Sequence, residues 1–67
     1  MPQPIAVKLR VLREELGLTQ KEAAKLANVS QVTLVRLESG RRPPYMQTVT
    51  KIARAYGVPL EELVGEE

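Results

Sequence analysis

The sequence contains no cysteine and no histidine, and its only aromatic residues are two tyrosines. Disulfide bonds are therefore excluded, as are metal sites built on thiolate or imidazole ligands. Because Phe and Trp are absent, the core has to be built mainly from Leu, Val, Ile, Ala and Met. We expect residues 1–67 to form one small domain without cofactor or metal, near the lower size limit for a core that has no cross-link.

Long hydrophobic runs are also lacking. No apolar stretch approaches the roughly 20 residues of a membrane span, and the first ten residues lack the pattern of a signal peptide. The expectation is a cytoplasmic protein with no membrane association. Without His or Cys, acid–base or nucleophilic catalysis would depend on Tyr, Lys and Glu, and no pair of these is placed in an evident pocket. The chain is therefore not expected to be an enzyme.

The charges are distributed unevenly although the net charge is only +2. Residues 1–54 hold all ten basic residues and four of the eight Glu, a balance of +6, whereas residues 55–67 hold four Glu and no base, a balance of −4. Such a distribution can be an ordinary solvated surface. It also suits a basic body that faces a polyanion, such as nucleic acid, while the acidic end points away.

The spacing of apolar residues predicts helices only, with no alternating strand pattern. The first predicted helix covers about 5–16 and ends before Gly17. A fourth follows the Arg41–Pro44 loop and ends at Gly57, and a short fifth covers about 59–64. The expected inward side chains of these three helices are Ile5, Leu9, Leu12 and Leu16; then Met46, Val49, Ile52, Ala53 and Tyr56; then Leu60 and Leu63.

Two short helices with clear caps are predicted between these. Thr19 and Glu22 have the spacing of a capping box, which starts a helix at about 20–27. Asn28 stands where the chain has to turn, since Asn tolerates the left-handed conformation. Ser30 is the expected cap of the next helix, which ends before Gly40. The fold class is thus all-α, with five short helices around one aliphatic core.

The helix after Ser30 should present a polar face outward. Leu34 and Leu37 are predicted to point into the core, and the outward positions are Gln31, Val32, Val35 and Arg36. Gln can pair with adenine, Arg with guanine, and Val can contact a thymine methyl group, so this face suits reading of base edges in DNA. The alternative is a solvated surface, and two valines on the same outer face argue against it because exposed apolar pairs suggest a partner.

Polar residues flank this helix where the phosphates of a docked duplex would run. Gln20 opens the preceding helix, whose N-terminus can hold a phosphate. The other candidates for backbone contacts lie on or just after the outward helix, and they are Thr33, Ser39, Arg41 and Arg42.

The run TQKEAAKLANVSQVTLVRLESGRRPP, followed by TKIARAYGVPLEELV, resembles the Cro/CI-type helix-turn-helix family of lambda-repressor-like regulators, also called xenobiotic-response-element regulators. The resemblance covers about Ile5 to Val64, with the motif at about 19–39. It implies a five-helix DNA-binding domain whose third helix enters the major groove. It further implies base contacts by Gln31, Val32 and Arg36, and backbone contacts by Gln20, Ser30, Ser39, Arg41 and Arg42.

The same resemblance implies an ion pair between Arg13 and Glu38, joining the first helix to the end of the third. We expect this pair to be exposed, to contribute only about 0–1 kcal/mol, and to orient the two helices.

Two function classes follow from these patterns. The first is a sequence-specific regulator of double-stranded DNA, such as a repressor, acting as a homodimer whose recognition helices lie about 34 Å apart. The dimer surface is expected in the region of Leu60, Leu63 and Val64. The second is a protein-interaction module, such as the antitoxin-type component of a toxin–antitoxin pair, in which Val32 and Val35 contact protein.

Overall fold

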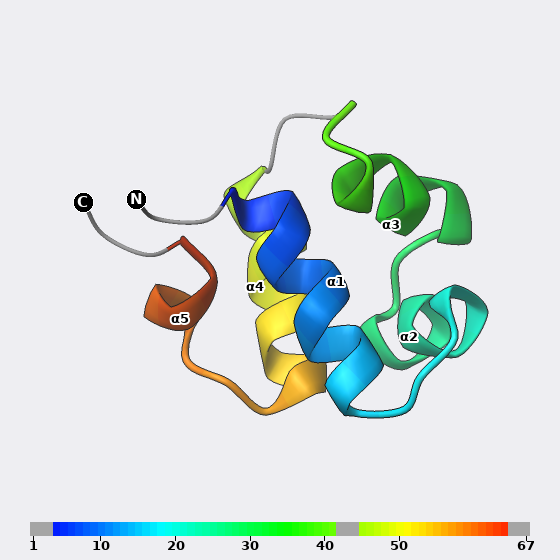
Figure 1. Ribbon diagram of the computed structural model, residues 1–67, viewed down its shortest axis with the longest axis horizontal. Helices are drawn as coiled ribbons and strands as arrows, with labels where there is room; N and C mark the ends of the chain where they lie inside the picture. The colour runs from blue at the N-terminus through cyan, green and yellow to red at the C-terminus, as the bar shows by residue number, and fades with distance from the viewer. Residues whose placement is uncertain (1–3, 42–44, 65–67) are drawn as a thin grey trace.

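The computed structural model describes residues 4–41 and 45–64, and these residues form five α-helices and no strand (Figure 1). The helices are α1 (Ile5–Glu15), α2 (Gln20–Ala27), α3 (Gln31–Glu38), α4 (Met46–Tyr56) and α5 (Leu60–Val64). The predicted all-α class is confirmed, and the predicted helix ends agree with these to within one residue.

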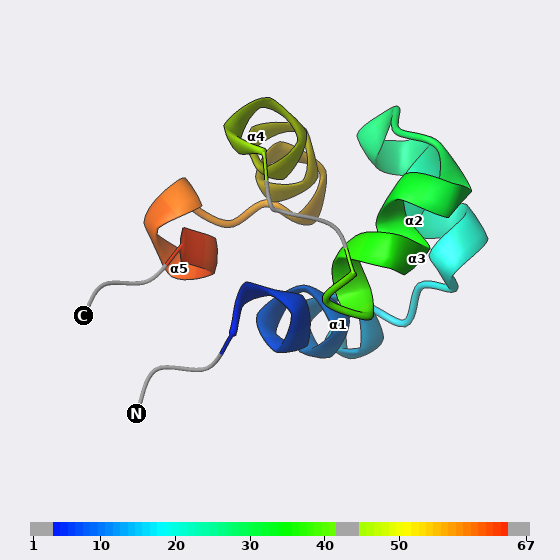
Figure 2. The ribbon, with the colours of Figure 1, turned by 90° about the horizontal axis from the view of Figure 1, so that it is seen from above.

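The helices α1 and α4 form the middle of the molecule. The pair α2 and α3 packs on one side of them, and α5 packs on the other side, as Figures 1 and 2 both show. Glu61 and Glu62 are exposed on α5. Figure 2 shows α5 on the opposite side of the domain from α3, so these two acidic residues lie away from α3. Glu66 and Glu67 lie outside the described residues. This placement fits the prediction that the acidic end points away from a face on α3.

Local capping sets the geometry of α2 and α3. The Thr19 hydroxyl accepts from the Glu22 N–H at 3.0 Å, and the Glu22 carboxylate accepts from the Thr19 N–H at 2.9 Å, which confirms the capping box. Asn28 ends α2 in the left-handed conformation with φ 59°. Ser30 then caps α3 by accepting from the Thr33 N–H at 3.0 Å. These three features fix the tight turn that sets the direction of α3 relative to α2.

The core is aliphatic, as predicted. Its largest fully buried side chains come from four of the five helices, namely Leu9, Leu34, Leu37, Val49, Ile52 and Leu63. On α2 the buried residues are all alanines (Ala23, Ala24 and Ala27), and their small side chains let α2 approach its neighbours closely.

Three expectations about apolar side chains are wrong. Leu16 is 50% exposed because it follows the end of α1, where the chain turns toward Gly17 and leaves the inward face of the helix. Met46 is 56% exposed because the buried part of α4 begins one turn later, at Val49. Leu63 is only 1% exposed, which confirms its predicted inward direction, but a core side chain cannot also form part of the predicted dimer surface. Val64 ends α5, and its side chain lies outside what the structure describes.

Candidate nucleic-acid interface

The two faces of α3 differ sharply in burial. Leu34 and Leu37 are buried at 0% and 1% exposure, which anchors the helix to the core. The four side chains predicted to read bases all lie on the exposed face, and they are Gln31, Val32, Val35 and Arg36. Together with Ser39 and Arg41 they line an open hollow of about 550 Å³. The structure therefore brings these predicted site residues together on one surface.

The polar side chains of this surface are available to a ligand. Within residues 4–41 and 45–64, neither the Gln31 amide nor the Arg36 guanidinium has a hydrogen-bond partner or an ion-pair partner. None of the residues that line the hollow is acidic, and two of them, Arg36 and Arg41, are basic. The hollow can therefore accept an anionic ligand and offers donor and acceptor groups at its centre.

The hydroxyl groups along α3 are partly used by the helix itself. Ser30 donates its hydroxyl hydrogen to Thr33 Oγ1 at 2.7 Å, and Ser39 donates its own to the Arg36 carbonyl at 3.0 Å. Each hydroxyl has a single hydrogen, so only the Thr33 hydroxyl keeps one that can be donated outward without breaking an existing bond. Arg41 is exposed just after α3. Arg42, the remaining predicted backbone contact, lies outside the described residues.

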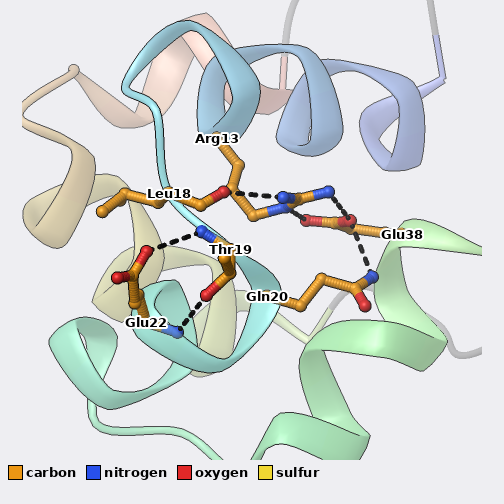
Figure 3. A network of polar contacts seen from close by, with 6 residues as sticks. All are labelled: Arg13, Leu18, Thr19, Gln20, Glu22 and Glu38. Carbon is orange, nitrogen blue, oxygen red and sulfur yellow. Dashed lines mark hydrogen bonds and ion pairs between the residues drawn. The ribbon is translucent and has the colours of Figure 1, made fainter.

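A polar network behind this surface ties α3 to two other helices (Figure 3). Arg13 of α1 donates from Nε to Glu38 Oε2 at 2.8 Å and from Nη2 to Glu38 Oε1 at 3.1 Å. Its Nη1 donates to the Leu18 carbonyl at 2.8 Å. Gln20 of α2 donates from Nε2 to Glu38 Oε1 at 3.1 Å. One carboxylate at the end of α3 thus receives bonds from α1 and from the start of α2.

The burial of this ion pair differs from what we expected. The side chains of Arg13 and Glu38 are only 11% and 3% exposed, because α1, α2 and α3 converge on them. The hydrogen bonds to Glu38 raise the pKa of the Arg13 guanidinium above its ordinary value, so Arg13 stays protonated. A buried, bidentate pair orients helices more firmly than an exposed one, and it is costly to break.

Gln20 has a role that the sequence did not reveal. The sequence predicts a contact to a DNA phosphate, and the structure shows that one of its amide hydrogens binds Glu38. The amide has a second hydrogen, which the bond to Glu38 does not use. The partner lies 18 positions away, so no local sequence pattern could have indicated the contact.

Tyr56 on α4 is a buried residue with an unsatisfied hydroxyl. Its side chain is 5% exposed, and within the described residues its Oη has no hydrogen-bond partner. Burial, helped by the negative charge of Glu38, raises the pKa of Tyr56 to about 12. A buried hydroxyl without a partner costs free energy, so Tyr56 contributes to the core through its ring alone.

We expect Tyr56→Phe to keep or raise the free energy of unfolding at neutral pH, by up to about 1 kcal/mol. The effect on alkaline stability should be clearer. The unfolded chain loses the tyrosine proton near pH 10, whereas the folded chain holds it until about pH 12. The wild type should therefore lose stability across this window, and the variant should lose less. Urea unfolding at several pH values measures both curves. Tyr45→Phe, at an exposed tyrosine, is the control, and equal curves for wild type and Tyr56→Phe would contradict the prediction.

The fold and the α3 surface define a helix-turn-helix domain in which α2, the Asn28 turn and α3 form the motif. Residues 9–63 match the model of the family HTH_3, described as Helix-turn-helix, and the chain therefore belongs to this family. It is a family of DNA-binding transcriptional regulators, which confirms the resemblance seen in the sequence.

Individual relatives support the same assignment. The chain is 42% identical over 59 residues to the cryptic phage CTXphi transcriptional repressor RstR of Vibrio cholerae, covering 88% of this chain and 53% of that repressor. It therefore spans about half the length of that relative. Among solved structures, the restriction-modification controller protein C.AhdI from Aeromonas hydrophila superposes with a TM-score of 0.85 at 29% identity, covering 88% of this chain and 89% of that one.

A third similarity involves an enzyme. The chain is 34% identical over 65 residues to glutamine–fructose-6-phosphate aminotransferase of Methanocaldococcus jannaschii, but this match covers only 6% of that enzyme. So small a share carries no argument for catalysis. Within the part of the chain that the structure describes, no helix has the length and apolar character needed to cross a membrane.

Proposed function

We propose that this protein is a sequence-specific regulator of transcription, acting as a repressor, that places α3 in the major groove of double-stranded DNA. The observation that carries the proposal is the outward face of α3, where Gln31 and Arg36 have no partner within the described residues and stand beside two exposed valines. These side-chain types match the edges of adenine, guanine and thymine in the major groove. A cytoplasmic location goes with this function.

Contacts with the phosphate backbone would position the helix. We call the exposed side of α3 with Gln31, Val32, Val35 and Arg36 the reading face. The Thr33 hydroxyl and the Arg41 guanidinium flank this face, and Arg42 follows Arg41 in the sequence. Gln20 is proposed to contribute through the amide hydrogen that Glu38 does not use, and Ser30 and Ser39 by exchanging their present hydroxyl bonds for bonds to phosphate. Such contacts supply affinity without sequence preference, whereas the α3 face chooses the site.

We further propose that two copies bind together. The domain measures 30 × 23 × 20 Å, so two copies side by side can place their α3 helices about one DNA turn apart, or ~34 Å. We place the dimer surface in the α5 region, with Leu63 removed from it because that side chain fills the core. A groove between α1 and α5, lined by Lys8, Val11, Leu12, Glu15 and Glu62, carries both signs of charge and suits a self-complementary contact.

The alternative function is a protein-interaction module, including an antitoxin-type component, and the same two exposed valines favour it. A salt titration separates the two proposals. Binding to mixed double-stranded DNA, followed by fluorescence anisotropy, should weaken about 100-fold between 50 and 200 mM salt if roughly four phosphates are contacted. Selection of bound sites from a random DNA pool should then return a two-fold symmetric sequence. Absence of binding at low salt would refute the proposal.

A further inference from the structure

The valines on the reading face stand out because they are apolar groups held at the surface by a well-packed helix. Val32 is 57% exposed and Val35 is 38% exposed, while Leu34 and Leu37 on the same helix fill the core. Both valines line the hollow between Gln31 and Arg36. Single exposed apolar residues are common, but two that share one hollow indicate an apolar group on the ligand.

The charged residues that line the hollow indicate which class of ligand it can bind. It is lined by two arginines, Arg36 and Arg41, and by no acidic residue, so it suits an anionic ligand. An anionic ligand that also presents small apolar groups is duplex DNA, in which the C5-methyl group of a pyrimidine projects into the major groove. Thymine carries this group, and 5-methylcytosine carries the same group at the same ring position.

Building on the proposed function, we infer that Val32 and Val35 are specificity-determining residues that select pyrimidines with a C5-methyl group. The two side chains are three residues apart, which separates them by about 4.5 Å along the helix axis. This is close to the rise of about 3.4 Å per base pair. The two methyl groups that they contact should therefore lie on neighbouring base pairs, or one pair apart, within each half-site.

The test uses the whole protein and the sequence selected from the random pool. Each thymine of one half-site is replaced singly by deoxyuridine, which removes only the methyl group, and each cytosine is replaced singly by 5-methylcytosine, which adds it. At one or two positions we expect the methyl group to strengthen wild-type binding about fourfold. A gain at a thymine position identifies thymine as the natural source of the methyl group, and a gain at a cytosine position identifies methylated cytosine.

Variants then connect each methyl group to a side chain. In Val32→Ala the methyl effect should disappear at one position, and in Val35→Ala at the neighbouring one. Leu26→Ala is the control, since it shortens an exposed apolar side chain of α2 that lines a different hollow. It should keep the full methyl effect.

The possible failures are distinguishable. Sequence-specific binding without any methyl effect, or with an effect that survives both valine substitutions, would overturn this inference and leave the proposed function standing. If both valine variants bind DNA as the wild type does, the valines do not contact DNA and the inference is overturned. If the wild type shows no sequence-specific binding, the inference fails together with the proposed function.

Discussion

Replacing Glu38 by alanine is expected to lower the free energy of unfolding by about 3 kcal/mol. The Glu38 carboxylate accepts two bonds from Arg13 and one from Gln20, and its side chain is only 3% exposed. Its removal leaves the guanidinium of Arg13 largely buried without its countercharge, and water cannot easily replace the lost partner. Because a domain of this size has a total stability of about 3–10 kcal/mol, the variant should be partly unfolded at 37 °C.

Urea or thermal unfolding followed by circular dichroism measures this loss. Glu38→Gln keeps an acceptor oxygen at the same place and should lose less, because only the charge and one acceptor are removed. Glu14→Ala, which removes an exposed carboxylate from the last turn of α1, is the matched control and should change stability by less than about 0.5 kcal/mol. A double-mutant cycle with Arg13→Ala isolates the pair itself. Equal losses from Glu38→Ala and Glu14→Ala would refute an organising role for the network.

Arg36→Ala is expected to weaken binding to the preferred DNA sequence by about 10- to 100-fold and to abolish preference at one base position. Arg36 lies on the reading face of α3, and its guanidinium has no partner within the described residues, so the side chain can reach a guanine edge. The fold should be unaffected, because the side chain is exposed. Anisotropy titrations against the selected site, and against sites altered at each position, measure both effects.

Two arginine controls make this prediction specific. Arg41→Ala should weaken all sequences alike and lower the slope of binding against salt by about one, as a phosphate contact does. We expect the same of Arg42→Ala. Arg54→Ala removes an exposed cation from the last turn of α4 and should leave binding nearly unchanged, because this end of α4 lies away from α3 (Figure 1). If Arg36→Ala and Arg41→Ala gave equal losses on every sequence, Arg36 would be a backbone contact only.

The features that could be predicted from the sequence are those set by neighbouring residues. The capping box needs Thr19 and Glu22, three positions apart, and the turn needs Asn28 at a left-handed position. The inward direction of Leu34 and Leu37, and the outward direction of Gln31 and Arg36, follow from helical periodicity alone. For this reason the sequence alone predicts the five helices and the residues on the reading face of α3.

Only the tertiary structure decided how deeply the polar side chains between the helices are buried. Arg13 and Glu38 are 25 positions apart, and their low exposure depends on three helices converging, which no local pattern encodes. The bond from Gln20 to Glu38 has the same origin. Periodicity predicts which side of a helix is apolar, but contacts between residues distant in sequence determine how far along the helix that side is buried. For this reason Leu16 and Met46 are exposed, although the periodicity predicts them to be inside. The sequence by itself thus determined the helices and the face of α3, while packing between helices decided which polar groups behind that face hold it in position.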